Sequence, residues 1–208
     1  MTNNSSQILH RRVQEKRDEV DRALPPLRLI DDGDIYWTTI EVIQSNVPDY
    51  FWHAPAASSY KHHNPFCCGE RGLWIHTLMV ATAYERLVDS YLEQGAISSY
   101  ERDLGRAAVL LHDLCKYGDA YEDGDRAAKD HDLQAAALVY DSDLDDWVAD
   151  AIASHMGPWY EGPEPETSLE ELVHLADMAA STKNGTFGVY RKPMEISKLY
   201  PNLPEAEL

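Results

Sequence analysis

The stretch AAVLLHDLCKYGD, residues Ala107 to Asp119, has the apolar pattern of a buried helix but carries two polar residues in its middle. His112 and Asp113 lie side by side there. An ionised carboxylate that leaves water loses several kcal/mol of solvation unless a partner compensates its charge. A buried position for Asp113 therefore predicts a compensating partner close to it.

Helical periodicity also dominates the sequence around this stretch, and alternating β-branched runs are nearly absent. Helices are predicted at residues 5–24, 35–46, 73–93, 99–117, 132–140, 144–155 and 168–183. The stretch 49–72, rich in Pro, Gly, His and aromatic residues, is expected to be an ordered loop over a pocket. The predicted fold class is all-α, a single helical bundle at 71–184. An N-terminal helical extension with its loop, 1–70, packs on this bundle, and a short irregular tail, 185–208, follows it.

The chain is strongly acidic, with 36 acidic and 18 basic residues and a formal charge of -18. This charge should repel a long nucleic-acid backbone, so such a partner is not expected. An acidic, lysine-poor surface is typical of proteins from salt-loving organisms, and we favour this solvation explanation for the charge. Because no apolar run of about 18 residues exists and the N-terminus lacks the apolar core of a signal peptide, a cytoplasmic protein without a membrane partner is expected.

Histidines and aspartates recur on the apolar faces of several predicted helices. His76, His112 and His155 each lie at helical spacing from apolar residues, which turns their side chains inward. Asp177 lies between two alanines of an apolar stripe, and His131 stands just before a predicted helix. One buried histidine is usually a hydrogen-bonded core residue. Several imidazoles and two carboxylates from different helices are instead the usual composition of a site for a divalent transition metal.

The residue types narrow the choice of metal without deciding it. Imidazole and carboxylate ligands suit Mn, Fe, Ni, Co or Zn better than Mg, which prefers oxygen ligands. We therefore expect one or two divalent transition metal ions per chain.

In order along the chain, GLWIHTLMVA, VLLHDLCKYG, KDHDLQAAAL, AIASHMGPW and HLADMAAS resemble the HD superfamily of metal-dependent phosphohydrolases, over about residues 72–181. The resemblance implies that the bundle is an HD domain. It also implies four primary metal ligands, which are His76, His112, Asp113 and Asp177. By the same resemblance, His131 and His155 match the extra histidines that hold a second metal or contact phosphate.

Two departures from the family pattern stand out. Cys115 replaces the Gly of the frequent HDLGK sequence, and His155-Met156 stands where many two-metal members carry a double histidine. In addition, APAASSYKHHNPFCCGERGLWIHTL looks like the segment that leads into the HD domain of certain bacterial 3'-to-5' exoribonucleases.

The resemblance implies hydrolysis of a phosphate ester by a metal-activated hydroxide. Asp113 is then both a ligand and the proton acceptor from water. Lys116, three residues after Asp113, either contacts phosphate or is the ion partner of Asp113, and the sequence does not decide between these two interpretations. The loop residues His62, His63 and Arg71 are candidates for binding the substrate.

Three functions remain open at this point. The first is a phosphohydrolase that cleaves a phosphate ester of a nucleotide or a similar small phosphorylated molecule. The second is a 3'-to-5' exonuclease or cyclic-nucleotide phosphodiesterase, and the third is a non-catalytic metal-binding HD domain. The sequence does not determine the oligomeric state.

Overall fold

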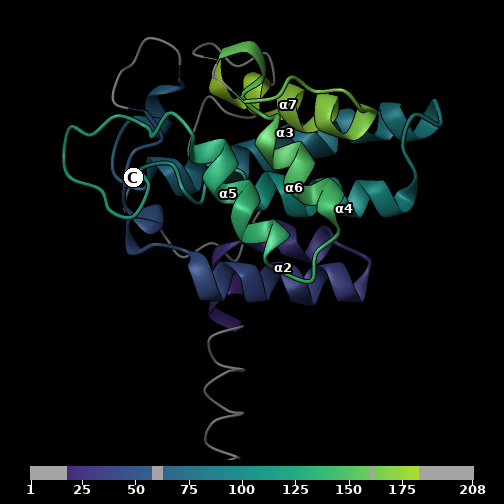
Figure 1. Cartoon of the computed structure of the whole chain (residues 1–208), viewed down its shortest axis with the longest axis horizontal. Coiled ribbons are helices and arrows are strands. Elements are labelled where there is room, and N and C mark those ends of the chain that lie inside the picture. Colours follow the sequence, from purple (N-terminus) through teal and green to yellow (C-terminus); the bar gives the residue numbers. More distant parts are fainter. Residues whose placement is uncertain (1–17, 58–62, 160–161, 183–208) are drawn as a thin grey trace, which may run out of the picture.

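The computed structural model describes residues 18–57, 63–159 and 162–182, and every regular element in these ranges is helical (Figure 1). The α-helices after the short turn of helix at residues 18–23 are α2 Gly33–Asn46, α3 Gly72–Glu93, α4 Ser99–Leu111, α5 His131–Tyr140, α6 Asp146–Ala153 and α7 Ser168–Ser181. Short 3₁₀ helices span Pro25–Leu29, Asp49–Trp52, Pro65–Cys67 and Gly157–Trp159. The all-α prediction is confirmed. In the part of the chain that the structure describes, no helix combines the length and apolar character that a bilayer span needs.

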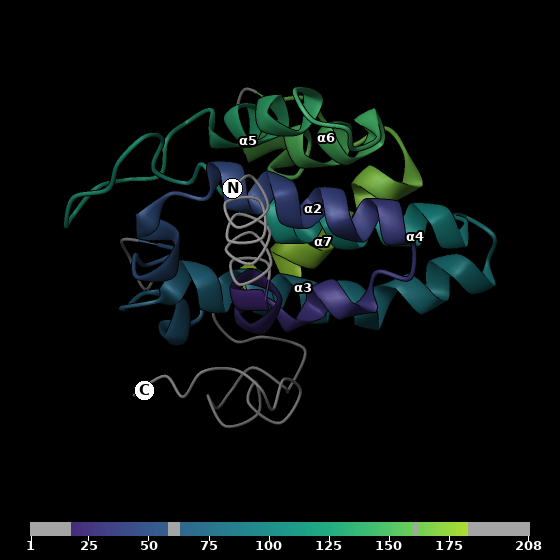
Figure 2. The ribbon, with the colours of Figure 1, turned by 90° about the horizontal axis from the view of Figure 1, so that it is seen from below.

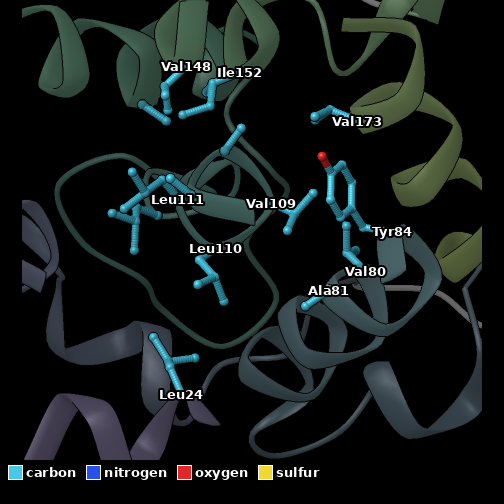
Figure 3. Packing of buried hydrophobic residues seen from close by; sticks show 14 of the residues in the cluster. Leu24, Val80, Ala81, Tyr84, Val109, Leu110, Leu111, Val148, Ile152 and Val173 are labelled. Atoms are coloured by element: carbon cyan, nitrogen blue, oxygen red, sulfur yellow. The ribbon is translucent and has the colours of Figure 1, made fainter. Parts of the chain in front are cut away.

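Helix α4 lies at the centre of the bundle, where it packs against α2, α3, α6 and α7. Figure 3 shows why the C-terminal part of this helix, residues 107–111, is apolar on all sides: Val109 points toward Tyr84 of α3, and Leu110 points toward Leu24 of the N-terminal segment, residues 18–57. Leu111 turns to another side, and all of these side chains are buried. A helix that is surrounded by other elements needs apolar residues around its whole circumference. The stretch that ends in His112 and Asp113 is therefore enclosed by neighbouring helices.

Side-chain caps mark where α2, α4, α6 and α7 begin. Before α4, the Ser98 hydroxyl accepts a hydrogen bond from the Glu101 amide at 3.2 Å, and the Glu101 carboxylate accepts one from the Ser98 amide at 2.8 Å. This reciprocal pair satisfies two amides that have no partner within the helix. Asp32 and Thr167 cap α2 and α7 with their side chains.

The predicted helix at 99–117 is wrong beyond Leu111, where α4 ends. Residues 112–118 instead form successive tight turns, with amide-to-carbonyl bonds from Leu114 to Leu111 at 3.1 Å and from Gly118 to Cys115 at 2.9 Å. Gly118 has φ +69°, a left-handed conformation that stops a helix. Apolar spacing alone does not distinguish this series of turns from a continuing helix. His112 and Asp113 thus lie on the first turn after α4.

Smaller differences concern the other helix ends. The helix predicted at 144–155 spans Asp146–Ala153, because Asp145 caps its first turn. The helix predicted at 5–24 lies largely outside the described residues, and its described part ends before Pro25, as expected. The predicted irregular tail at 185–208 also lies outside them.

The N-terminal segment packs directly on the bundle, where its helix α2 and its 3₁₀ helix Pro25–Leu29 contact α4 (Figure 2). The Trp74 indole donates a hydrogen bond to the Ala23 carbonyl at 2.7 Å, and the buried Asp103 carboxylate accepts the amides of Asp31 and Asp32 at 2.9 and 2.8 Å. Buried residues from this segment and from the bundle form one hydrophobic cluster. The boundaries predicted at residues 70/71 and 184/185 stay predictions.

Candidate metal centre

The six residues predicted to be metal ligands come from five parts of the bundle and are all buried. The residues and their elements are His76 on α3, His112 and Asp113 just after α4, His131 at the start of α5, His155 just after α6, and Asp177 on α7. The packing of α3, α6 and α7 around α4 brings them together.

Two groups of ligand atoms meet at distances that suit a metal ion. His76, His112 and Asp177 form one group, and His112, Asp113 and His155 form the other; within each, the ligand atoms lie within 4.8 Å of one another. In the first group, Asp177 Oδ1 lies 3.0 Å from His76 Nε2 and 3.9 Å from His112 Nε2. His112 belongs to both groups, so the two candidate positions adjoin each other.

Asp113 belongs to the second group, but it also lies near His76 of the first group, and its neighbours explain how its charge is compensated in the interior. Its carboxylate oxygens lie 3.6 Å from His76 Nε2 and 3.2 Å from His131 Nε2, and the Lys116 ammonium lies 3.0 Å away. Burial alone would raise the pKa of Asp113, but Lys116 and the imidazoles outweigh it and hold this pKa well below its usual range. Asp113 is therefore an ionised carboxylate among potential cationic partners.

Three of the histidines are fixed in one tautomer by the backbone. In His112, His131 and His155, Nδ1 lies within hydrogen-bond distance of the carbonyl oxygen three residues earlier, on Val109, Ala128 and Ile152, at 2.9, 2.7 and 2.7 Å. A carbonyl only accepts, so each Nδ1 carries the proton and each Nε2 lone pair is directed away from that carbonyl. For His112 and His155, the buried Nε2 has no hydrogen-bond partner within the described residues. This arrangement is the usual preparation of a histidine for metal binding.

The direction of the pKa shift separates His76 from His112 and His155. Burial lowers the pKa of His76, but the contacts with Asp177 and Asp113 outweigh this effect and raise it to about 10. Burial and the neighbouring His112 lower the pKa of His155 to about 3, and burial also lowers the pKa of His112. Neutral imidazoles with free Nε2 atoms beside two ionised carboxylates fit a divalent transition metal ion, and these buried groups could hold one or two.

The predicted substrate-binding residues lie in different surroundings. Lys116 is buried and its ammonium contacts the Asp113 carboxylate, which agrees with the interpretation of Lys116 as the ion partner of Asp113. The ring of His63 lies 5.6 Å from the ring of His76, and burial lowers the pKa of His63 to about 4. The guanidinium of Arg71 lies over the Trp74 ring, 4.5 Å from its centroid. His62 lies outside the described residues.

Two polar contacts around the centre are made by residues that the predicted site does not include, Ser181 and His174. The Ser181 hydroxyl donates a hydrogen bond to Asp177 Oδ1 at 3.2 Å, which the spacing of four residues on one helix could have indicated. His174 Nδ1 donates to the His155 carbonyl at 2.6 Å, and no sequence pattern indicates this pairing. Both contacts fix the position of a candidate ligand.

Comparison with known proteins agrees with this geometry. The family model for the HD domain matches residues 73–180, which contain all six residues of the cluster. Neither the curated proteins nor the solved structures give a match to the chain. Because the matched region covers more than half of the sequence and includes the buried His/Asp cluster, the chain belongs to the HD superfamily of metal-dependent phosphohydrolases.

Proposed function

We propose that this protein hydrolyses a phosphate ester of a nucleotide or a similar small phosphorylated molecule, with divalent transition metal bound at the His/Asp cluster. The observation that carries the proposal is the pair of adjoining ligand groups that share His112. When bound, a divalent transition ion supplies acidified water and Lewis acidity toward phosphoryl oxygens. The first ion would be held by His76, His112, Asp113 and Asp177, and His131 and His155 provide ligands for a second or contacts for phosphate.

The side chains of the centre have distinct roles in this reaction. Asp113 accepts the proton that the attacking water loses as its oxygen bonds to phosphorus and the ester P–O bond breaks. The buried Lys116 ammonium, 3.0 Å from Asp113, would supply positive charge beside a phosphate bound at the centre. His63, whose ring lies 5.6 Å from that of His76, would donate a hydrogen bond to the substrate.

The charge of the whole chain supports a small substrate. A net charge of -18 opposes a long phosphate backbone, whereas a buried centre loaded with divalent metal would attract a small anion locally. A small phosphorylated substrate inside the cell, without a membrane partner, is therefore part of the proposal. An exonuclease would need a basic track for the polymer.

The proposal is tested by phosphate release from purified protein that is loaded with Mn, Co or Ni. The substrates are nucleoside mono-, di- and triphosphates, cyclic nucleotides and a short single-stranded oligonucleotide. Hydrolysis of a small nucleotide is expected, with loss of at least about 100-fold in kcat when His112→Ala or Asp113→Ala removes a ligand. The exposed His53→Ala is a matched control that should keep full activity.

The other possible results would contradict the proposal in different ways. Full activity in both ligand variants would show that the centre is not the site of hydrolysis. Cleavage of the oligonucleotide alone would favour an exonuclease, and metal binding without hydrolysis of any substrate would favour a non-catalytic metal-binding domain.

A further inference from the structure

The turn that carries Asp113 and Lys116 lies outside any helix, so its backbone needs partners from elsewhere. After α4 ends at Leu111, the bonds between residues i and i+3 leave several carbonyl groups of 112–118 available. Buried carbonyls are nearly always paired in native proteins. A side chain more than sixty residues earlier in the sequence pairs with two of the carbonyls of this turn.

That partner is Tyr50, which is buried on the 3₁₀ helix Asp49–Trp52. Its hydroxyl lies 3.0 Å from the Leu114 carbonyl and 2.9 Å from the Gly118 carbonyl, and it accepts a hydrogen bond from the Tyr117 amide at 3.3 Å. Burial raises the pKa of Tyr50 to about 12, so the hydroxyl keeps the proton that it donates. One side chain thus joins both ends of the turn.

Tyr117 makes the reciprocal contact. Its hydroxyl donates a hydrogen bond to the Pro55 carbonyl at 2.6 Å, in the same N-terminal segment that carries Tyr50. The two rings meet edge to face, with centroids 5.7 Å apart. We call this pair, Tyr50 and Tyr117 with their hydrogen bonds, the tyrosine clasp.

The effect of the clasp extends beyond Asp113. The Lys116 carbonyl accepts a hydrogen bond from the Ala128 amide at 2.9 Å, and the Ala128 carbonyl accepts the Nδ1 proton of His131 at 2.7 Å. A shift of the turn would therefore move Asp113 and Lys116 directly and His131 through the backbone of Ala128.

We propose that the tyrosine clasp positions the metal centre, with Tyr50 and Tyr117 acting as positioning residues for Asp113, Lys116 and His131. Tyr50 and Pro55 lie outside residues 73–180, which match the HD domain. The N-terminal segment would then be required for a competent centre as well as for stability. This inference rests on the proposed function only in that the centre binds metal.

The test is a titration of metal-free full-length protein with Co²⁺, followed by the visible absorption of the bound ion. Tyr50→Phe and Tyr117→Phe should each lower the Co²⁺ affinity by about 10- to 100-fold and change the absorption band. The double variant should lose little more than either single variant, because the two residues act as one unit. If Tyr50→Phe does not fold, Tyr117→Phe decides the outcome.

Tyr84→Phe is the matched control, because Tyr84 is also buried and its hydroxyl also donates to a backbone carbonyl, that of Arg102 at 3.0 Å. It should lose similar stability but keep its Co²⁺ affinity within about twofold, since it touches no residue of the centre. Clasp variants that bind Co²⁺ as tightly as Tyr84→Phe would overturn the positioning role alone. Failure of the unaltered protein to bind Co²⁺ would overturn the proposed function and, with it, the clasp.

Discussion

At the scale of single residues, charge compensation at Asp113 governs the centre. Two ionised carboxylates are buried among apolar helices, and a metal ion and the protein's own cations can both neutralise them. In the protein alone, protonated His76 and Lys116 have this role. Metal binding must then displace the proton of His76, because a ligating imidazole is neutral.

Replacement of Lys116 by Gln tests whether Lys116 neutralises Asp113 when no metal is bound. Without metal, Lys116→Gln should destabilise the protein by about 3–5 kcal/mol, because a buried carboxylate loses its ion partner. With saturating Mn²⁺ the loss should be smaller, since the metal compensates Asp113. Urea unfolding with and without Mn²⁺ measures both values. The exposed Lys129→Gln is the control and should change stability by less than about 0.5 kcal/mol. If Lys116→Gln lost the same stability with and without Mn²⁺, the metal would not compensate Asp113.

The pKa of His155 predicts how acid affects the metal-free protein. Its pKa is about 3 in the folded state against an ordinary value of 6.5, so the unfolded chain binds a proton that the folded protein does not. The free energy of unfolding should therefore fall as the pH decreases from 6.5 toward 3, with up to about 1.4 kcal/mol per pH unit from this residue. The free energy of unfolding, measured with urea across this pH range, should depend less steeply on pH in His155→Gln than in the unaltered protein. Parallel slopes in the two proteins would contradict the assignment.

At the scale of elements, the segment after α6 holds His155 in place. Gly157 has φ +53°, and a Cβ atom there would lie 2.9 Å from the His174 ring, which donates to the His155 carbonyl. Gly157→Ala should therefore destabilise the protein by about 1–3 kcal/mol and weaken metal binding. Gly33→Ala, where a Cβ meets nothing within 4 Å, should be neutral or slightly stabilising. Thermal unfolding and metal titration of both variants check this, and equal behaviour would count against the packing role of Gly157.

Helical spacing predicted the elements of the site better than their ends. The apolar stripes around His76, His155 and Asp177 correctly placed these side chains inward, because a period of 3.6 residues fixes which face is buried. The same spacing extended α4 through Tyr117, since local periodicity contains no information about a distant hydroxyl. The partner that ties the turn, Tyr50, lies in an irregular segment without periodicity. Contacts of this kind depend on tertiary structure.

At the scale of the whole molecule, the all-α class and the convergence of the six residues were predictable from residue types and their order. The individual contacts by which the N-terminal segment packs on the bundle were not, such as those of Trp74 with Ala23 and of Asp103 with the backbone before α2. Nothing in the spacing of these residues pairs them.

The net charge of -18 predicts a salt dependence of overall stability. Repulsion among like charges opposes compaction, and salt screens it over distances beyond about 10 Å at 0.1 M. The free energy of unfolding should therefore rise between about 0.05 and 1 M NaCl. Urea unfolding at several salt concentrations measures the trend, and a decrease with added NaCl would show that surface ion pairs outweigh the repulsion.

The central claim is that His76, His112, Asp113 and Asp177 bind one divalent transition ion. Anomalous X-ray diffraction from crystals of the protein grown with Mn²⁺ tests it most directly. A strong anomalous peak is expected about 2.0–2.3 Å from both imidazole Nε2 atoms and from an oxygen of each carboxylate. A saturated crystal without a peak inside this cluster, or with its Mn²⁺ bound elsewhere on the protein, would contradict it.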